Sequence, residues 1–164
     1  MEQKIILAAG CFWGTQEYYR RLDGVVSTRV GYAQGHVVNP TYEQVKAQIS
    51  GHTESCEVIY QDEIISLEQI LDHYFTIVDP TSLNRQGEDE GTSYRTGIYT
   101  LSEEDLNEVK AYVDKQRDHY PNPIVVEVEK LEQFWDAEEY HQDYLIKNPN
   151  GYCHIDLSKL PPKK

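Results

Sequence analysis

The 164-residue sequence is poor in basic residues, and it lacks long apolar runs. It contains 15 Lys and Arg against 28 Asp and Glu, which gives a formal net charge of -13. Nucleic acids and anionic membranes bind clustered Lys and Arg, so we expect neither as a partner. No apolar stretch is long enough to cross a bilayer, and residues 1–4 lack the basic start of a secretory signal. These absences favour a cytoplasmic protein.

Cysteine is scarce as well, with three residues: Cys11, Cys56 and Cys153. An odd number of thiols in a chain without an export signal argues against a structural disulfide framework and favours reduced thiols. The spacing contains no C-x-x-C pair. His52, His141 and His154, taken together with Cys153, fit no standard zinc pattern, so the sequence predicts no metal site.

The chain has a suitable length for one domain, which we take as residues 1–164. Apolar periodicity predicts strands and helices, and Gly, Pro and capping residues mark their ends. The predicted strands are 5–9, 25–32, 54–60, 96–101 and 124–128; the predicted helices are 15–22, a short turn at 41–45, 66–78, one that starts at Ser102 and ends before Pro121, and 136–144. Between them, residues 81–95 form an unusually long polar loop, a feature that is more often functional than idle.

The first six main elements run strand, helix, strand, strand, helix, strand. This order matches the ferredoxin-like split βαβ fold, in which helices pack on a mixed or antiparallel sheet. We therefore predict an α/β (α+β) protein built as a two-layer sandwich. Residues 145–164 are predicted to form an irregular C-terminal tail that carries Cys153.

The stretch Gly10-Cys11-Phe12-Trp13-Gly14 follows the first predicted strand and precedes the first helix. A thiol at a helix N-terminus faces unpaired N–H groups and the positive end of the helix dipole, which favour the nucleophilic thiolate. The two aromatic residues would line an apolar pocket, and the glycines permit tight turning and close approach. Cys11 is thus a candidate nucleophile; the alternative is a buried structural cysteine with two core aromatics.

Further polar side chains lie in segments marked by Gly or Pro, where they are able to converge on a nucleophile. They are Tyr42, Glu54, Asp89, Tyr94 and Cys153. Each has a plainer interpretation. Glu54 alone would be a solvated strand-end carboxylate, Asp89 stands in an acidic run, and any one of 13 tyrosines is more often packing or surface. Cys56 is expected to be structural, because it lies in the middle of a strand with an apolar face.

The chain resembles the peptide methionine sulfoxide reductase A family over nearly its whole length. The matching motifs, in order, are Gly10-Cys11-Phe12-Trp13-Gly14, Gly31-Tyr32, Asn39-Pro40-Thr41-Tyr42-Glu43, Gly51-His52-Thr53-Glu54, Asp79-Pro80-Thr81, Asn84-Arg85-Gln86-Gly87, Gly91-Thr92-Ser93-Tyr94-Arg95, Tyr140-His141-Gln142 and Gly151-Tyr152-Cys153. A single motif of this kind occurs by chance, but so many in order do not.

By that resemblance, Cys11 attacks the sulfoxide sulfur and Glu54 protonates the sulfoxide oxygen. The resemblance also implies that Tyr42 and Tyr94 donate hydrogen bonds to that oxygen, with Asp89 assisting through water. The remaining roles are implied in the same way: Phe12 and Trp13 hold the S-methyl group, and Cys153 resolves the sulfenic acid to a disulfide that thioredoxin reduces.

The resemblance further implies the S epimer of methionine sulfoxide as substrate, either free or in proteins, and no metal or organic cofactor. For its acid role Glu54 needs a raised pKa, and burial beside apolar groups together with a nearby Cys11 thiolate would provide it. Nothing in the sequence demands more than a monomer.

Three features depart from the family pattern. Cys56 is an additional thiol that would compete with Cys153 as resolver, although its mid-strand position opposes an approach to Cys11. Ala33-Gln34-Gly35-His36 replaces a second glycine pair, and the tail lacks the further cysteine that many members use as a relay. Two other functions remain open on the residues alone. One is a cysteine hydrolase or acyltransferase with His52 or His141 as base. The other is a ferredoxin-like binding module with an inert thiol.

Overall fold

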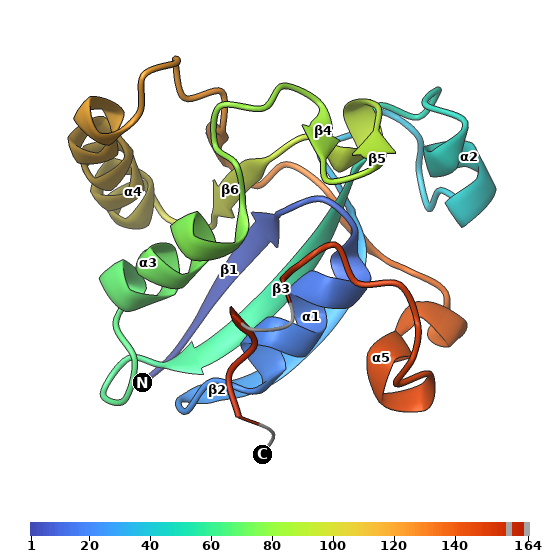
Figure 1. The fold of residues 1–164 in the computed structure, drawn as a ribbon, viewed down its shortest axis with the longest axis horizontal. Coiled ribbons are helices and arrows are strands. Elements are labelled where there is room, and N and C mark those ends of the chain that lie inside the picture. The colour runs from blue at the N-terminus through green and yellow to red at the C-terminus, as the bar shows by residue number, and fades with distance from the viewer. Residues whose placement is uncertain (157–158, 163–164) are drawn as a thin grey trace.

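The computed structural model describes residues 1–156 and 159–162 and contains one six-stranded sheet with helices packed against it (Figure 1). The helices are α1 (Phe12–Arg20), α2 (Tyr42–Lys46), α3 (Leu67–Ile77), α4 (Glu103–Gln116) and α5 (Tyr144–Lys147). The strands are β1 (Glu2–Ala8), β2 (Val25–Ala33), β3 (Thr53–Gln61), β4 (Arg85–Gln86), β5 (Asp89–Glu90), β6 (Gly97–Thr100), β7 (Glu127–Lys130) and β8 (Phe134–Asp136). Single 3₁₀ turns lie at η1 (Thr92–Tyr94), η2 (Arg117–His119) and η3 (Glu139–His141).

The large sheet has the strand order β7-β6-β1-β3-β2-β8. Its four central strands pair antiparallel, with α1 joining β1 to β2 and α3 lying between β3 and β6 in the chain. This is the ferredoxin-like split βαβ order, so the predicted fold class is confirmed. β7 extends the sheet in parallel beside β6, and β8 adds an antiparallel edge beside β2.

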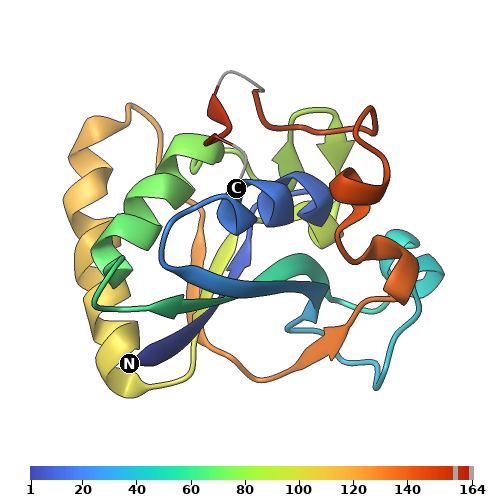
Figure 2. The same cartoon turned by 90° about the horizontal axis from the view of Figure 1, so that it is seen from below.

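The main core lies between the sheet and the helices. Figure 2 shows α1 and α3 on one face of the sheet. The side chains of Leu7, Val30, Cys56 and Val58 on that face are fully buried against the helices. The opposite face is covered more thinly, by a small cluster in which Leu131 and Phe134 pack over Ile6 and Tyr99. A two-layer arrangement follows, with the site on the helical side.

Local capping determines where several helices begin, as the sequence predicts at Ser66 and Ser102 but not at Thr41. Ser66 and Gln69 form a reciprocal capping box at α3, and Thr41 and Gln44 form another at α2. Ser102 accepts from the backbone N–H of Asp105 at the start of α4.

Four predicted segments need correction. The tail 145–164, expected to be irregular, contains most of the short helix α5 (Tyr144–Lys147). The strand expected at 124–128 begins only at Glu127 and runs to Lys130. The loop 81–95 contains the β4–β5 hairpin and a 3₁₀ turn, so it is more ordered than predicted. The helix predicted over 136–144 is wrong. That region ends β8, turns once at η3 and starts α5 only after Asp143, which has a left-handed φ of 53°.

The reason for this last error is long-range pairing. Gly31 and Ala33 of β2 pair with Asp136 and Phe134, and the absence of a side chain at Gly31 lets the backbone of Trp135 approach closely. Tertiary hydrogen bonds of this kind override the helical spacing of the sequence.

Candidate active site

Cys11 lies at the turn between β1 and α1, as the sequence predicts. Gly10 has a φ of 85°, a conformation that favours glycine, and Cys11 is the N-cap residue of α1. A side chain at Gly10 would also overlap Gln86 of the β4–β5 hairpin. The turn is therefore tight and closely covered, and Cys11 is only 6% exposed to solvent.

Burial raises the pKa of the Cys11 thiol, whereas the helix N-terminus alone would lower it. The pKa of Cys11 is raised well above its ordinary value, first by desolvation and then by the nearby Glu54 carboxylate. The backbone N–H of Trp13 lowers the pKa, but its effect is smaller. Burial therefore opposes the stabilisation of the thiolate that the helix N-terminus alone would give.

Glu54 lies at the start of β3 and points toward the first turn of α1. It is 2% exposed, and one carboxylate oxygen accepts the backbone N–H of Phe12 at 3.2 Å. Burial raises the pKa of Glu54 to about 8, while the bond from Phe12 acts in the opposite direction. The predicted raised pKa is thus present, and at pH 7 this side chain is mainly a neutral acid able to donate a proton.

Tyr42, Tyr94 and Asp89 reach the same place from three different segments: α2, the 3₁₀ turn η1 and strand β5. The pKa values of Tyr42 and Tyr94 are raised, mainly by burial and next by the charge of Glu54, and Cys11 affects both. The charge of Asp89 acts on Cys11, Glu54 and Tyr94. These side chains therefore lie near enough to influence one another's ionisation, and the two tyrosines bring neutral hydroxyl donors to the neighbourhood of the acid and the thiol.

Phe12 and Trp13 belong to an aromatic cluster whose centre is His141. Phe12 is buried, with its ring centroid 5.2 Å from that of His141 and 5.7 Å from that of Tyr32. Trp13 is half-buried; its indole N–H donates to Nδ1 of His141 at 3.0 Å, and its ring stacks on Tyr144 with centroids 3.8 Å apart. An indole face held in this way gives the site an apolar wall.

One functional residue that the sequence did not single out is Glu138. Its carboxylate accepts the hydroxyl of Tyr32 at 2.8 Å and the backbone N–H of Tyr42 at 2.9 Å, so it fixes the start of α2 beside the cluster. Its only sequence signal is its place two residues before Tyr140-His141-Gln142. That place does not reveal a carboxylate shared between two other segments.

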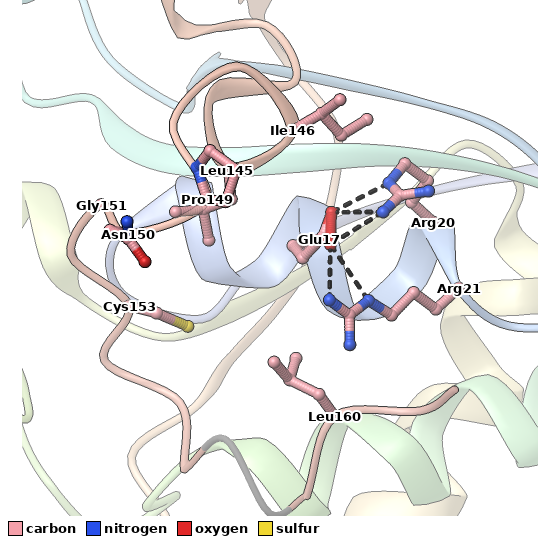
Figure 3. A pocket seen from close by; sticks show the side chains of 10 residues that line it. All are labelled: Glu17, Arg20, Arg21, Leu145, Ile146, Pro149, Asn150, Gly151, Cys153 and Leu160. Carbon is pink, nitrogen blue, oxygen red and sulfur yellow. Dashed lines mark hydrogen bonds and ion pairs between the residues drawn. The ribbon is translucent and has the colours of Figure 1, made fainter. Parts of the chain in front are cut away.

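Cys153 approaches the site from the C-terminal segment, which Figure 1 shows crossing α1. It is half-buried and unpaired, and its charge contributes to the raised pKa of Cys11. Its side chain also lines a cavity of about 510 Å³ (Figure 3). Other walls of this cavity are Leu160 and Glu17, the latter bracketed by ion pairs to Arg20 and Arg21. Cys153 is thus the thiol of the site that faces an open space.

Cys56 is fully buried in the middle of β3, opposite Leu7 in β1 and Val30 in β2. Desolvation strongly raises the pKa of its thiol. This placement agrees with a structural role.

The two histidines considered as bases for a hydrolase are both buried, and His141 lies inside the aromatic cluster beside Phe12, Trp13 and Tyr42. Nδ1 of His141 accepts the indole N–H of Trp13, and the His52 ring packs against the backbone of Gly35. In the part of the chain that the structure describes, no group of three or more His, Cys, Asp or Glu side chains has the geometry to hold a metal ion. The arrangement is suited to the transfer of a proton and two electrons to a polar bond whose neighbouring substituents are apolar.

Comparison with known proteins agrees with this chemistry. The family model described as peptide methionine sulfoxide reductase matches residues 3–163. Peptide methionine sulfoxide reductase MsrA of Clostridium botulinum (strain Hall) is 53% identical over 155 residues, which cover 94% of this chain and 99% of the relative.

Solved structures show the same fold. Mxr1 from Saccharomyces cerevisiae in reduced form has a TM-score of 0.89 at 36% identity, covering 99% of this chain and 93% of that one. A structure of Mxr1 in complex with Trx2 has a TM-score of 0.64 at 30% identity, covering 87% of this chain and 84% of that one.

Proposed function

The chain belongs to the peptide methionine sulfoxide reductase family, and on that premise we propose that it reduces the S epimer of methionine sulfoxide, free or in proteins, to methionine. The observation that carries the proposal is the buried pair of Cys11 and Glu54. A soft nucleophile and a carboxylic acid with a pKa of about 8 meet beside an apolar wall. The reaction needs a thiol as two-electron donor and a proton for the departing oxygen, and this pair provides both.

In the first step, the sulfur of Cys11 attacks the sulfoxide sulfur while Glu54 gives its proton to the sulfoxide oxygen. The thiol proton of Cys11 passes to the Glu54 carboxylate. The oxygen moves to Cys11, which becomes a sulfenic acid. Cys11 has then lost two electrons to the substrate sulfur, and methionine leaves as the reduced product. Tyr42 and Tyr94 donate hydrogen bonds to the oxygen, and Asp89 assists through water. Because the two groups exchange one proton, their titrations belong to the pair.

Phe12 and Trp13 hold the S-methyl group of the substrate in this proposal. The bond from Trp13 to His141 and its stack on Tyr144 support that role, because they fix the ring that faces the site. A pocket built from rigid aromatic side chains accepts a methyl group, but it has no polar partner for a charged group.

In the second step, Cys153 condenses with the Cys11 sulfenic acid to give a disulfide and water, and thioredoxin reduces the disulfide by thiol exchange. The complex of Mxr1 with Trx2 supports a thioredoxin as reductant. Cys153 faces the cavity of Figure 3 while Cys11 is buried, which favours approach from that side.

The proposal takes residues 1–164 as one catalytic domain, with 145–164 carrying the resolving thiol. It works as a monomer in the cytoplasm, where thioredoxin keeps its three unpaired thiols reduced. In the described residues, no helix is long and apolar enough to cross a membrane.

A single-turnover assay without reductant tests the reaction. Each epimer of a blocked methionine sulfoxide is offered, and the methionine formed and the thiols lost are counted. We expect about one product per enzyme from the S epimer, with loss of the Cys11 and Cys153 thiols. Cys153→Ser should still form methionine once but fail to lose a second thiol. No product from either epimer would reject the proposal.

A further inference from the structure

Residues 152–155 cross the first turn of α1. The side chains at the two ends of this segment, Tyr152 and Ile155, hold it to the rest of the molecule. The Tyr152 hydroxyl donates to the Asp89 carboxylate at 3.0 Å. Ile155 is buried in the main core. Between these two anchors lie Cys153 and His154, so the position of the resolving thiol depends on what holds this short segment.

His154 holds the segment to the nucleophile turn. Its Nε2 lies 2.7 Å from the backbone oxygen of Ala9, two residues before Cys11. A carbonyl oxygen only accepts, so Nε2 must carry the proton. Burial lowers the pKa of His154, which leaves the ring neutral at pH 7 with its single proton in this bond.

Gly14 shows how closely the segment packs on α1. A Cβ on Gly14 would stand 2.9 Å from the sulfur of Cys153 and 3.2 Å from Nδ1 of His154. Gly14 lies inside α1, three residues after Cys11, so the thiol of Cys153 sits directly on the first helical turn. The glycine leaves room for that thiol, and any larger residue would displace it.

We propose that His154 is a positioning residue for the disulfide step: its bond to Ala9 holds the Cys153 thiol on the first turn of α1, ready to meet Cys11. The inference rests on the proposed function and concerns its second step. There the Cys153 thiol gives up its proton to water and its sulfur attacks the sulfur of the Cys11 sulfenic acid. The S–S bond forms, the S–O bond breaks, and the hydroxide leaves with a proton as water.

No external oxidant is required, because the sulfenic acid already holds the oxidising equivalent. Without the His154 bond, the segment between Tyr152 and Ile155 samples more conformations, and productive encounters between the two sulfurs become rarer.

The test is the single-turnover assay followed in time, with methionine and remaining thiols measured separately after acid quench. His154→Leu fills similar space without a donor, whereas His154→Gln keeps an N–H able to reach the Ala9 oxygen. We expect the methionine phase to stay unchanged in both. Thiol loss should slow about tenfold in the Leu variant and stay within about threefold of the wild type in the Gln variant. His119→Leu, at an exposed histidine, is the matched control.

Thiol loss at the wild-type rate in His154→Leu would overturn the inference. So would an equal slowing of both phases, because that would indicate a general structural role. A wild-type enzyme that forms no methionine would instead reject the proposed function, so the two failures are distinguishable.

Gly14→Ala gives an independent measurement. Alanine has a higher helix propensity than glycine, but its Cβ would crowd the side chains of Cys153, His154 and Ile155, so the two effects on thermal stability oppose each other. The added Cβ meets the sulfur of Cys153, and we expect thiol loss to slow more than methionine formation does. Disulfide formation at the wild-type rate in this variant would contradict the placement of Cys153 on α1.

Discussion

Two regions meet at Cys11, and they are held in place by different forces. β1, the first turn of α1 and β3 are fixed by the hydrogen-bonded ladder of the sheet and by apolar burial. Residues 134–155 contribute a single three-residue edge strand to that ladder. They are fixed instead by side chains that bind the backbone of other elements.

Gln142 illustrates the second kind of attachment. Its amide accepts the N–H of Val30 at 2.9 Å and donates to the oxygens of Val30 and Ala137 at 2.8 and 3.1 Å. Glu138 and His154 act similarly toward Tyr42 and Ala9. The comparison teaches that the reacting groups sit on the rigid region, while the groups that position them and the resolving thiol sit on a region held by a few replaceable bonds.

The largest effect is expected in the rigid region, from Glu54→Gln. At pH 7 the wild-type acid still holds its proton, whereas an amide does not supply one, so kcat/KM should fall about 10²–10³-fold. A pH–rate profile checks this. The ratio of wild-type to variant kcat/KM should become smaller above pH 8, where the wild-type acid also ionises. Glu57→Gln, on the same strand with an ion pair to Lys4, is the control. A constant ratio across pH would remove Glu54 as the proton donor.

The same substitution has a stability consequence of defined sign. Because burial raises the pKa of Glu54 to about 8, the folded protein binds a proton that the unfolded chain releases at lower pH. Stability from this group is therefore lost as the pH rises from about 4.5 to 8. Glu54→Gln should raise the Tm more at pH 9 than at pH 5. Equal changes at both pH values would argue against a buried, protonated Glu54.

In the second region, Gln142→Leu removes three hydrogen bonds and leaves the buried N–H and oxygen of Val30 without their side-chain partner. The free energy of unfolding should fall by about 2–4 kcal/mol. Urea unfolding measures it. A loss below about 0.5 kcal/mol would show that this segment is held mainly by packing.

A smaller effect is expected from Glu138→Gln, which exchanges one of two carboxylate acceptors for an amide N–H. Tyr42 or Tyr32 then loses its acceptor, and we expect kcat to fall about tenfold with little change in Tm. Glu139→Gln, at the exposed neighbour, should be silent. Equal activity in both variants would remove Glu138 from the positioning network.

The smallest effect should come from Cys56→Ala, which trims a fully buried side chain. We expect a loss of about 1 kcal/mol in stability and no change in methionine formation or thiol loss. Slower thiol loss in this variant would make Cys56 a participant in the disulfide step.

The two regions also differ in how far the sequence predicts them. Capping residues such as Ser66 and Ser102 and the apolar run before Gly10 act locally, so they define the central fold and the turn at Cys11 without knowledge of distant contacts. The helical spacing over 136–144 fails because its residues bind β2, more than a hundred positions away in the chain. The raised pKa of Cys11 is unforeseen for a related reason, since the helix N-terminus is visible in sequence whereas the burial that outweighs it is not.

The protonated, covered Cys11 has a consequence for survival under oxidative stress. Hydrogen peroxide reacts with thiolates that solvent can reach, and it oxidises them beyond the sulfenic state when nothing intervenes. Cys11 is 6% exposed and its pKa is raised, so we expect the reduced protein to react with hydrogen peroxide more slowly at this thiol than an exposed, low-pKa thiol does.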